Sequence, residues 1–130
     1  MSDNNPKVVK NHEDWNVYRF AFDSAMAVFN VSKSFPKEET YSLTDQIRRS
    51  SRSVCANLAE AWRRRRYKGS FLLRLNDAEA EAAETQVWIT FAVKSQYLDV
   101  ETGRKLYGEY NRIIGIIVKI TNRPNKWLLQ

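Results

Sequence analysis

The chain has 130 residues, of which 43% are hydrophobic and 28% charged, and its formal net charge is +6. Such a length forms one domain with its own core and is too short for a binding domain plus a separate catalytic domain. His12 is the only histidine and Cys55 the only cysteine, which excludes a zinc site with His or Cys ligands and a histidine-based catalytic triad within one chain.

The sequence also disfavours a membrane span and an enzyme. The longest apolar run, residues 113–118, falls well short of the roughly 20 residues that a membrane span requires, and no charged-then-apolar leader opens the chain. The four glycines lie too far apart for a phosphate-binding loop, and Cys55 stands in a helical apolar pattern that is typical of a buried thiol. We therefore expect a cytoplasmic, non-enzymatic protein with no membrane contact, metal, cofactor or catalytic residue.

The apolar residues recur with a helical period throughout and predict four helices and no strands. The helices are expected at residues 14–33, 42–66, 70–97 and 100–122. Ser42 and Asp45 approximate a capping box at the start of the second helix, and Asp99 caps the fourth. Short connections make sequential helices antiparallel, so the predicted fold class is all-α, a single up-down-up-down four-helix bundle.

Each predicted helix has one apolar face that we expect to form the core. On the first helix this face consists of Trp15, Tyr18, Phe22, Ala25, Met26 and Phe29. On the second it consists of Leu43, Ile47, Ser51, Val54, Leu58 and Trp62. The third and fourth helices contribute Phe71, Leu75, Ala78, Ala82, Ile89 and Val93, and then Leu106, Tyr110, Ile113, Ile117 and Ile120.

The third predicted helix has a second apolar face nearly opposite the first. This face comprises Leu73, Ala80, Val87, Phe91 and Leu98. On the fourth helix, Gly108 and Gly115 share one side, where each costs about 1 kcal/mol relative to Ala but lets another backbone approach. We expect these two glycines and the residues Leu73, Val87 and Phe91 to lie where copies of the chain meet. A wide core with scattered exposed apolar residues is the alternative.

Positive charge gathers between residues 43 and 68. Eight basic residues against two acidic ones give this segment +6, so the rest of the chain sums to about zero. The eight are Arg48, Arg49, Arg52, Arg63, Arg64, Arg65, Arg66 and Lys68. Arginine grips phosphate with paired donors and stacks on bases, which favours RNA or DNA as a partner. The alternative is that Arg48 and Arg49 form salt bridges with Glu38, Glu39 or acids of the third helix, within one subunit or between subunits.

The same segment carries a family resemblance. Residues 35–65, followed by the EAEAAETQ and QYLD segments, resemble the bacterial four-helix bundle proteins known as 23S ribosomal RNA intervening-sequence proteins, over roughly residues 14–122. The strongest match is Gln46, Ile47, Arg48, Arg49, Ser53, Asn57, Leu58, Ala59 and Glu60. The chain departs from the family pattern at residues 55–56, where Pro is common, and at residues 61–62, where Gly is common.

The resemblance implies a homopentameric ring and a structural polar network of Asn57, Glu60, Glu84 and Gln86 between the second and third helices. Related proteins are accessory factors of diversity-generating retroelements, in which a basic ring binds nucleic acid and a reverse transcriptase. The expected partners are therefore another copy of the chain, RNA or DNA, and a reverse transcriptase or other acidic protein. A ring-shaped protein scaffold that binds no nucleic acid is the alternative function.

Overall fold

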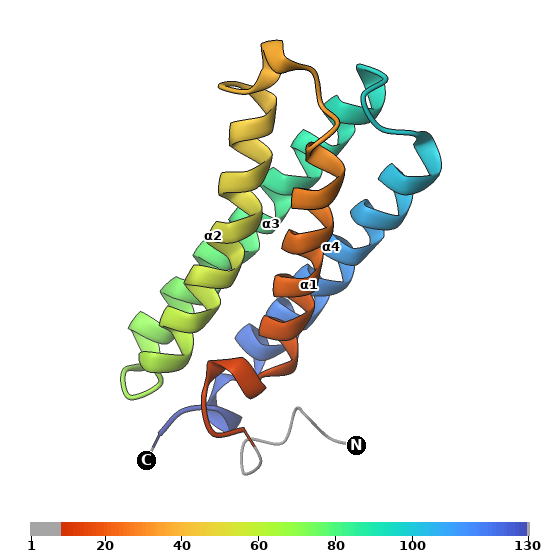
Figure 1. Ribbon diagram of the computed structural model, residues 1–130. Coiled ribbons are helices and arrows are strands. Elements are labelled where there is room, and N and C mark those ends of the chain that lie inside the picture. Colours follow the sequence, from red (N-terminus) through yellow and green to blue (C-terminus); the bar gives the residue numbers. More distant parts are fainter. Residues whose placement is uncertain (1–8, 130) are drawn as a thin grey trace.

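The computed structural model describes residues 9–129, which contain helices and no strand (Figure 1). The four long helices are α1 (Asn16–Ser32), α2 (Leu43–Arg63), α3 (Lys68–Lys94) and α4 (Val100–Asn122). Three short 3-10 helices flank or join them: η1 (His12–Asp14), η2 (Lys37–Glu39) and η3 (Pro124–Lys126). The all-α fold class predicted from the sequence is confirmed.

The long helices pack side by side as an antiparallel bundle. α2 packs against α1 and α3, and α4 packs against α3 and α1. Figure 1 shows η1, η3 and the turn between α2 and α3 at the same end of the bundle. Among residues 9–129, no helix combines the length and the apolarity that crossing a lipid bilayer requires.

Two predicted helix boundaries move because of local turn chemistry. α2 ends at Arg63, where the backbone N–H of Arg64 bonds to the carbonyls of Glu60 and Ala61, so the rest of the arginine run lies in the turn. α3 ends at Lys94 and not near residue 97, because Gln96 adopts a positive φ of 65°. The N–H groups of Gln96 and Tyr97 then bond back to the carbonyls of Val93 and Ala92, the Schellman pattern that terminates a helix.

The predicted capping box at Ser42 is wrong, whereas the Asp99 cap is confirmed. Asp99 accepts a hydrogen bond from the backbone N–H of Thr102 at 3.0 Å. At the start of α2, the Ser42 side chain caps no backbone N–H group. Instead, the Glu39 carboxylate accepts hydrogen bonds from the Ser42 hydroxyl and, at 3.2 Å, from the backbone N–H of Leu43. These bonds, with a third from the Tyr97 hydroxyl, lower the pKa of Glu39. Glu39 thus takes the place of the Ser42 cap.

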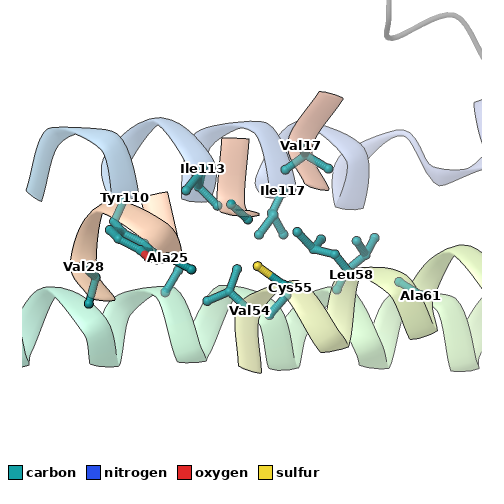
Figure 2. Packing of buried hydrophobic residues seen from close by; sticks show 14 of the residues in the cluster. Val17, Ala25, Val28, Val54, Cys55, Leu58, Ala61, Tyr110, Ile113 and Ile117 are labelled. Carbon is teal, nitrogen blue, oxygen red and sulfur yellow. The ribbon is translucent and has the colours of Figure 1, made fainter. Parts of the chain in front are cut away.

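The core faces of α2 and α4 lie where the sequence predicts, and Figure 2 shows Val54, Cys55 and Leu58 meeting Tyr110, Ile113 and Ile117. The predicted face of α3 is buried apart from Val93, which is half-buried. Burial raises the pKa of the Cys55 thiol to about 11, as expected for a thiol that is not a nucleophile.

The predicted core face of α1 is wrong in part. Phe22 and Met26 are 48% and 45% exposed, and beside Ala25 the helix buries Val17, Ala21, Ser24 and Val28, which the sequence reasoning did not select. The buried side chains are smaller, and the rings of Phe20 and Phe29 beside them lie under Arg112 of α4 and Arg48 of α2. Of the six predicted residues, only Trp15 and Ala25 are buried. The displaced aromatic residues form part of the surface.

Candidate nucleic-acid interface

Arg48 and Arg52, on the middle of α2, pack over an aromatic ring. Their guanidinium carbons lie 4.7 and 5.5 Å from the centre of the Phe29 ring on α1. The Lys33 ammonium lies 5.0 Å from the same centre, and the Nε of Arg48 donates to the Ser32 hydroxyl at 2.8 Å. These cation–π contacts hold the charges in place without an acidic partner.

The predicted alternative that Arg48 pairs with Glu38 or Glu39 in its own subunit is therefore wrong. Glu39 is already bonded to Ser42, Leu43 and Tyr97. Arg49 is exposed, and its charge lies within electrostatic reach of Glu81 on α3 without an ion pair among the described residues. Salt bridges from these arginines to another subunit stay a prediction.

Two arginines of the run after α2 belong to the fold. Arg65 lies flat on Trp62, with its guanidinium carbon 3.4 Å from the ring centre. The Nε of Arg65 donates to the backbone carbonyl of Trp62 at 2.8 Å, and a terminal guanidinium nitrogen donates to the backbone carbonyl of Trp127 at 3.4 Å. The backbone carbonyl of Arg65 accepts from the backbone N–H of Leu129 at 3.0 Å. Burial, and then repulsion from Arg63, lower the pKa of Arg65. Arg65 thus fixes the C-terminal segment to the end of α2.

Arg64 is also engaged. It pairs with Glu60 at 3.4 Å and donates to the Ser70 hydroxyl at 3.2 Å, which bridges the turn between α2 and α3. Arg63, Arg66 and Lys68 differ. Their side chains are exposed and form no ion pair or hydrogen bond with any residue within 9–129. The exposed cations of residues 43–68 that form no ion pair with a described residue make up what we call the exposed basic surface, namely Arg49, Arg52, Arg63, Arg66 and Lys68.

The four residues of the predicted polar network do not form one network. Asn57 and Glu60 do connect α2 with α3, because Arg74 of α3 donates to the Asn57 side-chain oxygen at 3.3 Å and lies 3.8 Å from the Glu60 carboxylate. Arg74 also pairs with Asp77 at 3.2 Å, and Asn57 donates to the Ser53 carbonyl at 3.0 Å. Arg74 is the central member, and the sequence reasoning missed it.

Gln86 and Glu84 lie elsewhere. The Gln86 amide donates to the Asn111 side chain at 2.8 Å and to the Tyr107 carbonyl at 3.2 Å, so it connects α3 with α4. Glu84 accepts from the Trp88 indole at 3.1 Å within α3. In the sequence, Arg74 directly precedes the core residue Leu75, and Asn111 directly follows the core residue Tyr110. This position beside the core is the one signal that could have indicated them as polar partners of Asn57 and Gln86.

The second apolar face of α3 is uncovered in the single chain. Leu73, Val87 and Phe91 are 53%, 48% and 55% exposed, whereas Leu98 lies beyond the helix and packs against the core. A Cβ added at Gly108 or Gly115 would meet no atom, so both glycines face open space. Contact between copies at these five interface candidates stays a prediction.

Within residues 9–129, no three His, Cys, Asp or Glu side chains converge as a metal site would require. The described features define an all-α bundle with a basic surface along α2 and the turn after it, and with an exposed apolar stripe on α3. The family model of the 23S rRNA-intervening sequence proteins matches residues 13–119. The chain therefore belongs to this family, and the resemblance drawn from the Gln46–Glu60 segment is confirmed.

A solved structure supports the same assignment. It is the crystal structure of a protein of unknown function from the S23 ribosomal protein family of Bacteroides thetaiotaomicron. The two chains are 25% identical and superpose with a TM-score of 0.73, over 81% of this chain and 97% of the other. No curated protein matches the chain.

Proposed function

We propose that the protein is a non-enzymatic, oligomeric protein that binds RNA or DNA. The observation that supports this most is the exposed basic surface, where Arg63, Arg66 and Lys68 have no acidic partner among the described residues. Exposed cations without an acidic partner attract a polyanion, and phosphate contacts release condensed counterions on binding. The description of the family, which refers to 23S rRNA, makes RNA the first ligand to test.

Oligomerisation would multiply this charge. The uncovered stripe of Leu73, Val87 and Phe91, with open backbone at Gly108 and Gly115, offers an apolar contact to another copy. The family resemblance suggests a pentameric ring. A ring repeats the basic surface once per subunit, so that one nucleic acid can engage several subunits and gain avidity without any new contact.

A triple variant tests the binding surface. Arg63→Gln, Arg66→Gln and Lys68→Gln remove three exposed charges while leaving the structural contacts of Arg64 and Arg65 in place. We expect the triple variant to bind a labelled RNA or DNA oligomer at least about tenfold more weakly in fluorescence anisotropy at low salt. The matched control is Lys37→Gln, Lys105→Gln and Lys119→Gln, which changes the net charge equally at exposed sites elsewhere. Equal weakening in both triple variants would reject the exposed basic surface as the binding site.

A protein scaffold is the second candidate function, and the uncovered apolar stripe of α3 favours it. In that case the arginines bridge subunits or meet an acidic protein such as a reverse transcriptase. The triple variant would then change the oligomer size or the melting temperature and leave nucleic-acid affinity, if any, unaltered. Size exclusion with light scattering on the same samples distinguishes the two functions.

A further inference from the structure

The outer edge between α1 and α2 combines aromatic and basic side chains. Tyr18, Phe22 and Phe29 are spaced four and seven residues apart and so share one face of α1. That face lies toward α2, because Phe29 contacts Arg48 and Arg52. Tyr18 also lies near α2. Burial raises its pKa most, and the charge of the Cys55 thiolate on α2 raises it further. We call these five residues, Tyr18, Phe22, Phe29, Arg48 and Arg52, the aromatic–arginine edge.

The rings along this edge are ordered and partly open. Tyr18 and Phe22 stack with their centres 6.2 Å apart and an angle of 28° between their planes. Phe22 is 48% exposed, so part of its ring is open to solvent. About two turns further along α1, the Phe29 ring lies under the guanidinium groups of Arg48 and Arg52 and the Lys33 ammonium.

This combination fits one class of ligand. Proteins that bind single-stranded nucleic acid join a positively charged track to aromatic faces on which unpaired bases stack. A duplex hides its base faces inside the helix and would use only the cations. Arg48 and Arg52 form no ion pair with a described residue, so their charge is available to phosphates.

We infer that the aromatic–arginine edge binds a single-stranded segment of nucleic acid. An unpaired base stacks on the open face of Phe22, and Arg48 and Arg52 contact the neighbouring phosphates. This inference rests on the proposed function and adds strandedness to it, because the exposed basic surface by itself attracts single strands and duplexes alike.

A comparison of three probes tests the inference on the full chain. The probes are a labelled 20-nucleotide single strand, its duplex, and a strand of equal charge with abasic sites in place of bases. We expect the wild-type protein to bind the base-bearing strand roughly tenfold more tightly than the abasic strand, as one stacked base contributes a factor of this order. Phe22→Ala should remove this preference and leave duplex binding unchanged.

Two further variants keep the test specific. Tyr41→Ala removes an exposed aromatic side chain, 94% against 48%, from the turn before α2, outside both the edge and the apolar stripe of α3, and should keep the preference for bases. Phe22→Leu keeps an apolar side chain without a ring, so it should behave as Phe22→Ala does if stacking is the cause.

Each outcome separates this inference from the proposed function. If the wild-type protein binds all three probes equally, or Phe22→Ala keeps the preference for bases, the inference is wrong and nucleic-acid binding by the exposed basic surface stands. If no probe binds, the proposed function fails as well. If Phe22→Ala changes the oligomer size in light scattering and not the preference among probes, the edge is a contact between copies of the chain, which also overturns the inference.

Discussion

Neighbouring arginines in one run have different environments and therefore different roles. Arg65 is half-buried, stacked on Trp62 and bonded to two backbone carbonyls, while Arg66 is exposed and has no described partner. The difference arises from the turn after Arg63, which directs one side chain back toward the aromatic cluster and the next toward solvent. Trp15, Trp62 and Trp127 form that cluster, with ring centres 5.2 to 6.1 Å apart.

Arg65→Ala should therefore destabilise the fold, and Arg66→Ala should not. Loss of the contact with Trp62 and of two hydrogen bonds should lower the free energy of unfolding by about 1–3 kcal/mol. For a chain of this size the melting temperature should fall by roughly 4–10 °C, as circular dichroism would measure. Arg66→Ala should stay within about 0.5 kcal/mol of the wild type. Equal melting temperatures for the two variants would contradict a structural role for Arg65.

At the scale of helices, burial depends on the shape of the neighbours as well as on hydrophobicity. α2 and α4 each have one apolar face, and the sequence predicted both correctly. α1 has two candidate faces, and hydrophobicity alone favours the larger one with Phe22 and Met26. The structure buries the smaller face with Val17, Ala21 and Val28, and cations of the neighbouring helices cover the rings beside it, Arg48 over Phe29 and Arg112 over Phe20.

The glycines of α4 show the same dependence on neighbours. Gly103 is buried where α4 passes α3, and a Cβ at this position would collide with the Val93 side chain. Val93 is β-branched and has one strongly preferred rotamer in a helix, so it cannot easily move away. The sequence reasoning selected Gly108 and Gly115 and overlooked this internal contact.

Gly103→Ala should lower the melting temperature, whereas Gly69→Ala should not, because a Cβ at Gly69 in the first turn of α3 would meet no atom. Overpacking typically costs about 1–3 kcal/mol, partly offset by the helix propensity of Ala, while at an open site the propensity gain of up to about 1 kcal/mol acts alone. Chemical denaturation of both variants should thus differ by about 1–3 kcal/mol in unfolding free energy. A Gly103→Ala variant that is as stable as Gly69→Ala would show that Val93 yields to the added methyl group.

At the scale of the whole molecule, the excess of positive charge and the apolar stripe lie on different elements. Residues 43–68, which are mainly α2 and the turn after it, carry a net charge of +6, and the stripe of Leu73, Val87 and Phe91 lies on α3. The net charge of the segment and the exposure of Leu73, Val87 and Phe91 could be predicted from the sequence. The partners of individual arginines could not, because Arg65 meets Trp127 across 62 residues and Arg48 meets Ser32 across a helix–helix contact.

The exposed apolar stripe of Leu73, Val87 and Phe91 predicts that copies of the chain associate, and one substitution in the stripe should weaken this association. Phe91→Glu would place a charge in an apolar contact and should cost several kcal/mol per contact, shifting the protein toward the monomer. Size exclusion coupled to light scattering would detect the shift. Asn30→Glu provides a control, because it adds the same negative charge at an exposed position on α1, away from the stripe. A wild-type protein that elutes as a 15.2 kDa monomer at micromolar concentration would refute the assembly itself.

The salt dependence of nucleic-acid binding tests the central claim most directly. If the exposed basic surface contacts phosphates, the logarithm of the wild-type association constant should fall linearly with the logarithm of the salt concentration, and each contact should add about 0.7 to 0.9 to the slope. Replacing Arg63, Arg66 and Lys68 with Gln should then flatten the slope by about two to three, while helicity and oligomer size stay the same. An unchanged slope in this triple variant would contradict the account.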